Sequence, residues 1–411
     1  MYNKTVGIIG GGAAGLMAAI TAVRSGCECC IFDVNDNLGK KILSTGNGRC
    51  NYTNSNMDYN YFNSDNMEFV KTAIEQFGHE DTVKFFRDLG VVPRNKNGYF
   101  YPISNQASTI RSVLESEVKR LGVDLYLSTK VKSISKSNEG FHLKTTDGTY
   151  VVDKCILATG GLATSYLGND GSGFNMVYEF GHKTNKITPA LVPLTVDDKA
   201  IAGLAGVRCA GSVTLFVNGA VMASDTGELQ FNKDSISGIP VFQVSRFATQ
   251  ALKDKIDVYT LIDFVPFMSD SELTADLRTR FSSDNWGRTA YEALNGLLND
   301  KVISLILSKN NIPADSDANA LSPSMIPAIR DMLKNFRVSI NGSKGFDSAQ
   351  VTAGGILLTN INPKTMESNY CPGLHFAGEV MDVDGPCGGY NLQWAWTSGY
   401  LAGRGVANDN C

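Results

Sequence analysis

The chain has 411 residues, which at roughly 150 residues per domain predicts two or three domains. Its 43% hydrophobic and 19% charged residues are typical of a globular protein with a sizeable core. A net charge of -4 argues against a nucleic-acid-binding protein, whose surface would normally be basic. The 41 glycines follow no short period, which excludes a fibrous protein.

The cysteines and one apolar run bear on location. The nine cysteines are odd in number and several lie in apolar runs, so we expect reduced thiols in a cytoplasmic protein. The uncharged run 5–23 approaches the length of a membrane span, but glycines interrupt it and we expect no membrane association. The cysteines and histidines show no metal-ligand spacing, so no metal site is predicted. The sequence makes no prediction of oligomeric state.

The first 34 residues predict a β-α-β unit. A short apolar strand ends at Ile9, a helix follows over Ala13–Ser25, and Gly26 lies where a helix C-cap is expected. A second strand covers Cys29–Val34. Such a unit implies parallel strands joined by a right-handed crossover. Further on we expect helices over 66–90 and 104–121, and strands over 125–134, 140–145, 149–152 and 155–158.

The pattern changes after about residue 187. A hairpin is predicted over Ser212–Ala223 with Asn218-Gly219 at its turn, and a capping box at Ser269 opens a run of helices. Near residue 345 glycine-rich turns like those of the N-terminal segment return. We therefore predict an α/β fold in which a split Rossmann-like domain holds two insertions, a β-rich barrel-like domain and a helical subdomain. The predicted boundaries are 1–187 and 345–411, 188–268, and 269–344.

A glycine fingerprint indicates a dinucleotide site. Gly10-x-Gly12-x-x-Gly15 follows the first strand and opens the helix, where free N–H groups and the helix dipole would bind a pyrophosphate beside Ala13 and Ala14. Asp33 ends the second strand, where an acid would accept hydrogen bonds from a ribose. The alternative is a purely structural glycine-rich turn.

Two further strand ends favour FAD over NAD. One leads into Ala158-Thr159-Gly160, and the other into Gly378-Glu379. Both are similar to the ATG and GD elements of glutathione-reductase-like FAD folds. Because the sequence holds one complete fingerprint, a nicotinamide such as NAD(P)H would dock as a transient co-substrate without a domain of its own.

Two polar clusters are expected to complete the cofactor site. The loop 39–54 would neutralise the pyrophosphate and reach a flavin edge, and the cluster 378–393 precedes a helix expected over Trp394–Arg404 whose positive end would face the flavin. Each cluster has a purely structural alternative. The loop 39–54 would then be a solvated polar loop, and the cluster 378–393 a glycine-rich connection capped by Asn391. The additional residues predicted to bind the cofactor are Lys40, Lys41, Thr45, Gly46, Gly48, Asp382, Gly389, Asn391 and Leu392.

The sequence resembles the BaiN/YhiN-like flavoprotein family, which includes aminoacetone oxidases. The matching stretches are GGGAAGLMAA at 10–19, GKKILSTGNGRCNYTN at 39–54, ATGG at 158–161, GELQFNKDSISGIP at 227–240, AQVTAGG at 349–355, PKTMES at 363–368 and PGLHFAGEVMDVDGPCGGYNLQWAW at 372–396. The resemblance implies non-covalent FAD in a split domain, with an inserted β-barrel-like domain and a small helical one. It also implies that Arg49, Cys50 and Asn51 lie at the flavin and that Val131 contacts the adenosine half. Cys387 departs from the Thr or small residue expected there.

Candidate catalytic groups are few. Tyr390 is a candidate proton donor, with an aromatic lining role as the alternative, and Cys50 and Cys387 are candidates for redox work beside the flavin, with simple packing as the alternative. Cys27-x-x-Cys30 enters a predicted buried strand, so packing is favoured over redox or metal binding.

We predict an FAD-dependent oxidoreductase that passes a hydride through flavin N5 to a small molecule. The favoured reaction is NAD(P)H-driven reduction of an activated C=C bond in a steroid- or bile-acid-like enone. Family members differ in substrate, so an O2-dependent oxidase of a small amine is kept as an alternative. A non-catalytic flavin-binding sensor or RNA-modification accessory protein is the third.

Overall fold

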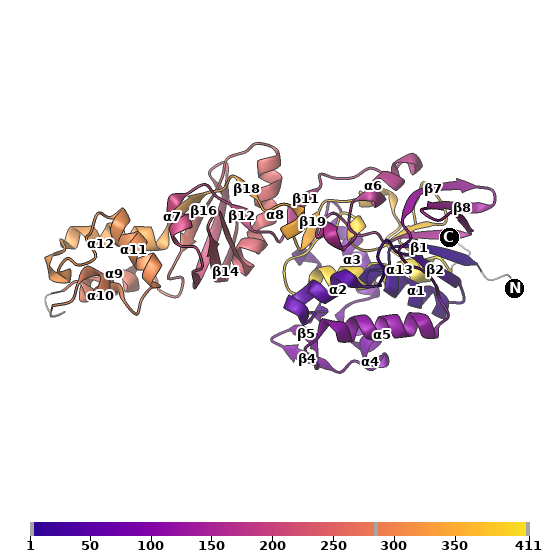
Figure 1. Cartoon of the computed structure of the whole chain (residues 1–411), viewed down its shortest axis with the longest axis horizontal. Coiled ribbons are helices and arrows are strands. Elements are labelled where there is room, and N and C mark those ends of the chain that lie inside the picture. The colour runs from indigo at the N-terminus through magenta and orange to yellow at the C-terminus, as the bar shows by residue number, and fades with distance from the viewer. Residues whose placement is uncertain (1–3, 283–286, 408–411) are drawn as a thin grey trace. The chain divides into compact units, whose positions relative to one another are not determined.

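In the computed structural model, which describes residues 4–282 and 287–407, the chain forms two compact units (Figure 1). Unit 1 comprises Met1–Ile187 and Gln350–Cys411, and unit 2 comprises Thr188–Ala349. Each unit has a hydrophobic core of its own. The finer division of the insertion into a β-rich and a helical domain stays a prediction.

The centre of unit 1 is a five-stranded parallel sheet in the order β20-β10-β1-β2-β6. The predicted β-α-β unit is confirmed, since β1 precedes helix α1 in the chain, β2 follows it, and the two strands pair in parallel. The apolar side chains of the three central strands are buried, as expected for a parallel sheet covered on both faces. The elements are β1 (Thr5–Ile9), α1 (Ala13–Arg24), β2 (Glu28–Phe32), β6 (Asp124–Tyr126), β10 (Lys154–Leu157) and β20 (Leu374–Phe376).

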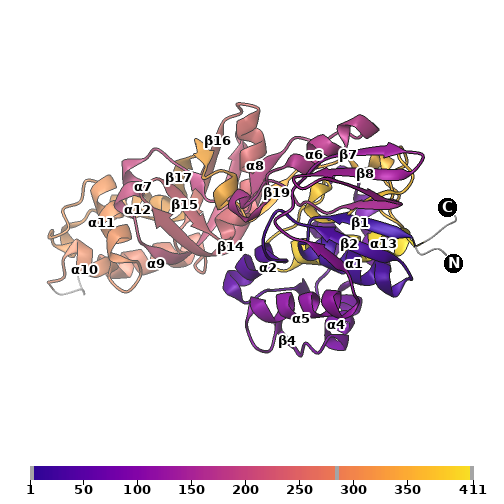
Figure 2. The same ribbon diagram turned by 45° about the vertical axis from the view of Figure 1, so that its right-hand side comes forward.

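The first and last helices of unit 1 pack closely, although nearly the whole sequence separates them (Figures 1 and 2). Helix α13 (Tyr390–Gly405) places Gly399 and Gly403, four residues apart, against α1. A Cβ at Gly399 would lie 2.4 Å from the Ala14 carbonyl oxygen, and one at Gly403 would lie 2.5 Å from the Ala18 carbonyl oxygen. The two glycines therefore set the helix spacing that joins the C-terminal segment to the N-terminal one.

Two small antiparallel sheets and further helices complete unit 1. The sheets are β3-β5-β4 and β7-β8-β9. The elements are α2 (Lys40–Ser44), β3 (Thr53–Asn54), α3 (Met67–Gln76), α4 (His79–Asp88), β4 (Pro93–Lys96), β5 (Tyr99–Pro102), α5 (Ala107–Arg120), β7 (Val131–Ser137), β8 (Gly140–Thr145), β9 (Thr149–Val152) and α6 (Ser172–Met176), and the short strand β19 (Val351–Ala353) lies outside both sheets.

Three sequence-based boundaries were wrong. The strand expected over 125–134 is two strands in different sheets, because the chain turns at Ser128, whose φ is +54°. The helix expected over 66–90 is two helices, since the Asp81 carboxylate accepts a hydrogen bond from the Gly78 N–H and starts α4 afresh. The last helix begins at Tyr390 rather than Trp394, directly after Gly389 in the left-handed conformation.

Unit 2 is built on a seven-stranded antiparallel sheet in the order β17-β16-β13-β14-β15-β12-β18. The two edge strands, β17 and β18, are separated by two residues in the sequence, so the sheet curls until its edges approach, as in a barrel. The predicted hairpin turn at Asn218-Gly219 is confirmed. The elements are β11 (Thr188–Ala190), β12 (Leu194–Thr195), α7 (Lys199–Gly203), β13 (Arg208–Val217), β14 (Ala220–Asn232), β15 (Ser235–Gly238), α8 (Ile239–Lys253), β16 (Val258–Asp263), α9 (Asp270–Arg280), α10 (Ala290–Leu294), α11 (Asp300–Lys309), α12 (Ile326–Lys334), β17 (Phe336–Ser339) and β18 (Gly342–Ser343).

Across residues 4–282 and 287–407, no helix has both the length and the apolar composition needed to cross a bilayer.

Candidate active site: a dinucleotide pocket

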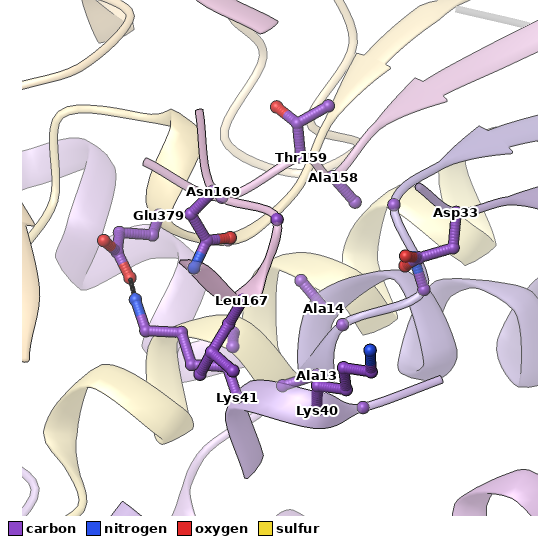
Figure 3. A pocket seen from close by; sticks show the side chains of 18 of the residues that line it. Ala13, Ala14, Asp33, Lys40, Lys41, Ala158, Thr159, Leu167, Asn169 and Glu379 are labelled. Atoms are coloured by element: carbon purple, nitrogen blue, oxygen red, sulfur yellow. Dashed lines mark hydrogen bonds and ion pairs between the residues drawn. The ribbon is translucent and has the colours of Figure 1, made fainter. Parts of the chain in front are cut away.

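A cavity of about 1330 Å³, part of it open to solvent, lies in unit 1 (Figure 3). Residues that follow β1, β2, β10 and β20 all line it, so it sits at the carboxyl ends of the parallel strands. This edge of an open α/β sheet is where ligands bind in such folds. Helix α1 begins at the cavity with its first residues, Ala13 and Ala14, on the lining.

The three fingerprint glycines have different physical roles. A Cβ at Gly10, whose φ is +103°, would lie 2.4 Å from the Ala158 carbonyl oxygen, and a Cβ at Gly15 would lie 1.9 Å from the Gly10 carbonyl oxygen. Both are therefore required for packing. A Cβ at Gly12 would meet nothing within 4 Å, so this glycine leaves open the space beside the first turn of α1. No side chain caps that turn, and its N–H groups suit a phosphate.

Asp33 is held rigidly at the end of β2. One carboxylate oxygen accepts a hydrogen bond from the Gly11 N–H at 2.7 Å, and the other accepts one from the Asn35 N–H at 2.7 Å. The side chain lines the cavity while remaining largely buried. A fixed carboxylate in this position suits the hydroxyls of a ribose.

The polar groups that face the cavity suit a dinucleotide. Uncapped N–H groups at the start of α1 and the fixed Asp33 carboxylate together fit a molecule such as FAD, which they would hold at its phosphates and its ribose. The Thr159 hydroxyl is buried without a hydrogen-bond partner among the described residues.

The structure brings most of the predicted cofactor residues to this cavity. The predicted residues on the lining are Gly10, Gly12, Ala13, Ala14, Asp33, Lys40, Lys41, Thr45, Val131, Ala158, Thr159, Gly160, Gly378, Glu379, Asn391 and Leu392. The predicted residues that do not line it are Gly15, Gly46, Gly48, Arg49, Cys50, Asn51, Asp382 and Gly389. The second group stays a set of predicted flavin neighbours.

Asn391 lines the cavity, but its side chain is used in hydrogen bonds within the protein. Its amide oxygen accepts a hydrogen bond from the Gly385 N–H, and its amide nitrogen donates to the Gly385 carbonyl oxygen. The side chain is thus occupied in fixing the turn before α13, while the first turn of that helix lines the cavity.

Sequence reasoning missed several lining residues. Lys130 precedes β7, and Asn169 and Asp170 lie on the segment that follows β10 and also brings Leu167 to the cavity (Figure 3). The turn sequence Gly168-Asn169-Asp170-Gly171 is a signal for a tight loop, but nothing local shows that this loop returns to the cavity.

The two candidate catalytic side chains lie outside the cavity lining. The Tyr390 hydroxyl donates to the Asn56 carbonyl oxygen at 2.9 Å, and burial raises the pKa of Tyr390 to about 12. Its ring packs against Tyr61 and Phe62, with ring centroids 5.4 Å and 5.9 Å away. These contacts show a ring packed against other aromatic side chains rather than one that lines the cavity. Cys387 is half-buried in the turn before α13.

Burial keeps the inner thiols protonated. The pKa of Cys30 is raised to about 12, and that of the fully buried Cys50 also to about 12, in both cases chiefly by desolvation. Cys27, Cys29 and Cys30 are all buried at β2, which favours packing over redox exchange. His375 is equally enclosed, and desolvation lowers its pKa to about 4.

The family model of the HI0933-like protein Rossmann domain matches residues 4–405. The chain belongs to this family. It is 40% identical over 98% of both chains to a 3-dehydro-bile acid delta(4,6)-reductase from Clostridium scindens. It is 30% identical over 97% of its length, and 96% of the relative's, to a ribosomal RNA dihydrouridine synthase from Escherichia coli.

A solved structure of 3-ketosteroid-delta4-(5alpha)-dehydrogenase from Rhodococcus jostii shares the fold. The TM-score is 0.53 at 15% identity, with 99% of this chain and 97% of that chain covered. The predicted resemblance and fold class are confirmed. Membership of the family identifies the chain as an FAD-dependent oxidoreductase, which confirms the predicted enzyme class.

Proposed function

We propose that this enzyme reduces a C=C bond conjugated to a carbonyl group in a steroid-like enone, with NAD(P)H as the transient reductant. The observation that carries the proposal is the end-to-end identity of 40% to a reductase whose name specifies a 3-dehydro bile acid with double bonds at positions 4 and 6. In the balanced reaction, NAD(P)H and a proton reduce the C=C bond, which gives NAD(P)+ and the saturated ketone. Bound FAD supplies hydride transfer through its N5 position.

The chain's own residues would prepare this chemistry. The N–H groups that follow Gly12 would bind the pyrophosphate, and Asp33 would accept hydrogen bonds from the ribose. The N-terminal turn of α13, which begins at the cavity, would direct the positive end of the helix dipole toward the cofactor. We keep Tyr390 and Cys387 as candidates for supplying the proton that completes the reduction.

A second candidate is reduction of uridine in ribosomal RNA, because relatives at 29% and 30% identity are named for forming dihydrouridine. Uridine also presents a C=C bond conjugated to a carbonyl, so the two reactions share their chemistry. The charge of unit 2 favours the small enone: it contains 15 Lys and Arg against 18 Asp and Glu. A surface that engages RNA phosphates is expected to be basic.

Anaerobic stopped-flow spectroscopy separates the candidates. We expect NADH or NADPH to bleach the flavin absorbance, and a 3-oxo-4,6-diene steroid to restore it with a mass gain of two hydrogens per C=C bond reduced. If only an rRNA transcript restored the flavin absorbance, the substrate would be uridine in RNA rather than a steroid-like enone. Bleaching only by a small amine, with peroxide formed in air, would favour the oxidase. The absence of bleaching by any donor would favour the sensor.

Location is a lesser part of the proposal. All the described cysteines are free thiols, which is consistent with the reducing cytoplasm that we propose for this enzyme.

A further inference from the structure

A short segment between β10 and α6 separates the cofactor cavity from solvent. Tyr166 of this segment is 71% exposed, whereas its neighbour Leu167 lines the cavity (Figure 3). The segment is therefore a single layer of chain with the cavity on one side and solvent on the other. We call residues 163–172 the clasp. Its residues on the cavity lining are Leu167, Gly168, Asn169, Asp170 and Ser172.

Gly168 lets the clasp lie directly on the residues that follow Asp33. Its φ is +100°, a conformation that glycine adopts without strain. A Cβ at Gly168 would lie 2.6 Å from the Asn35 amide nitrogen and 2.8 Å from a Val34 methyl carbon. No larger residue fits at this position while the clasp is closed.

One latch ties the clasp to the end of β2. The Asn35 side-chain amide nitrogen donates to the Leu167 carbonyl oxygen at 2.9 Å and to an Asp33 carboxylate oxygen at 3.1 Å. The Asn35 N–H donates to the same Asp33 oxygen at 2.7 Å. Asn35 thus couples the closed clasp to the carboxylate that suits the adenosine ribose of FAD. The clasp therefore belongs to the adenosine end of the site.

A second latch is an ion pair. Lys130, which precedes β7, pairs with Asp170 of the clasp, and the two side chains are 40% and 42% exposed. At the base of the clasp, the Thr352 hydroxyl accepts hydrogen bonds from the Leu162 and Ala163 N–H groups at 2.8 and 3.0 Å. One hydrogen bond and one solvent-screened ion pair are weak contacts, so the tip of the clasp can open while its base stays fixed.

We propose that the clasp gates the cofactor site: FAD enters and leaves the cavity only while the clasp is open, and the two latches hold it closed over the adenosine half. Release of FAD then waits for both latches to break together, so one FAD molecule stays bound through many turnovers. The inference rests on the proposed FAD site, but not on the identity of the substrate or of the reductant.

A gate has a kinetic signature that a simple binding contact lacks. Loosening the closed state of a gate raises the association and dissociation rate constants together, so the Kd changes less than either of them. Loss of a direct contact mainly raises the dissociation rate constant. Gly168→Ala distinguishes the two cases, because it removes no side chain that could touch FAD. Its Cβ would press against Asn35 only while the clasp is closed.

The test is stopped-flow mixing of apoprotein with FAD, followed by flavin fluorescence, and release of FAD from the holoprotein into an excess of an unrelated apoflavoprotein. We expect Gly168→Ala to raise both rate constants by about three- to tenfold. Asn35→Ala, which removes one latch, should raise both by about two- to fivefold. The matched control is Gly26→Ala, where φ is +94° but a Cβ would meet nothing within 4 Å. It brings similar backbone strain and should leave both rate constants unchanged.

A rise in the dissociation rate constant alone in Gly168→Ala, or no change in either rate constant, would overturn the proposal and make the clasp a fixed wall of the cavity. Equal changes in Gly26→Ala would also overturn it, because backbone strain would then be the cause. If Gly168→Ala fails to fold, Asn35→Ala decides by the same comparison of the two rate constants. Failure of the wild-type apoprotein to bind FAD would instead refute the FAD site itself.

Discussion

The contact between α1 and α13 predicts that a Gly→Ala substitution inside a helix lowers the stability of the protein, which is the reverse of its usual effect. In a helix interior, Gly→Ala normally stabilises a protein by up to about 1 kcal/mol. At Gly399, however, the new Cβ would lie 2.4 Å from the Ala14 carbonyl oxygen, whereas carbon–oxygen contacts normally begin at about 3.3 Å. Helix α13 must therefore retreat by about 1 Å from α1.

Overpacking of this kind costs about 1–3 kcal/mol, which outweighs the gain in helix propensity. Gly203, the last residue of α7 in unit 2, is the control for helix propensity, because a Cβ there would meet nothing within 4 Å; its effect is read from the unfolding of unit 2. We expect Gly399→Ala to lower the free energy of unfolding of unit 1 by about 1–2 kcal/mol. Gly203→Ala should leave the stability unchanged or raise it slightly.

Urea denaturation followed by release of FAD fluorescence reports on unit 1, while far-ultraviolet circular dichroism follows both units. A movement of α13 should also reach the cofactor, since the Ser398 hydroxyl accepts a hydrogen bond from the Gly378 N–H and the Trp394 indole donates to the Gly378 carbonyl oxygen. We therefore expect weaker FAD binding as well. Stabilisation of unit 1 by Gly399→Ala would refute the packing argument.

Three further changes test other parts of unit 1. Gly15→Ala should abolish FAD binding, measured by the flavin content of the purified protein, because its Cβ would lie 1.9 Å from the Gly10 carbonyl oxygen; retained flavin would contradict this. Cys50→Ser combined with Cys387→Ser should leave the rate of flavin reduction by NAD(P)H within about twofold, since burial keeps the Cys50 thiol protonated; a large loss would revive the redox hypothesis. The pKa of His375 is lowered to about 4 from its ordinary value of about 6.5, so the unfolded chain takes up a proton more readily. The stability contributed by neutral His375 is therefore complete above about pH 6.5 and is lost as the pH falls toward 4. We expect His375→Gln to flatten the plot of the urea midpoint against pH over that range. The same plot for the variant and the wild type would contradict this assignment.

The parts of the structure that sequence predicted well are those fixed by local chemistry. The β-α-β unit follows from an apolar strand, a glycine turn and a helix with its C-cap, all within 34 residues. The hairpin at Asn218-Gly219 follows in the same way, because these residues accept the positive φ angles of a tight turn. In both cases the residues that determine the element are neighbours in the chain.

The parts that were missed depend on distant residues. Lys41 and Glu379 are separated by 338 positions, and no feature of either segment shows that their charges meet. Gly399 and Gly403 read as ordinary helix residues until α1 lies against them. The strand expected over 125–134 failed because the turn at Ser128 contains no glycine or proline, so the local sequence did not mark the change of sheet.

The same long-range contacts link cofactor binding to the folding of one unit. All the residues that line the cavity belong to unit 1, and they come from both of its chain segments. The site therefore forms only when these segments meet, so FAD should bind folded unit 1 and not its unfolded chain. At a free concentration 100 times its Kd, FAD should stabilise unit 1 by about 2.7 kcal/mol. Unit 2 has a separate core, so its unfolding transition should not move. Hydrogen exchange in the presence and absence of FAD resolves the two units, and equal protection of both would show that they unfold as one cooperative body.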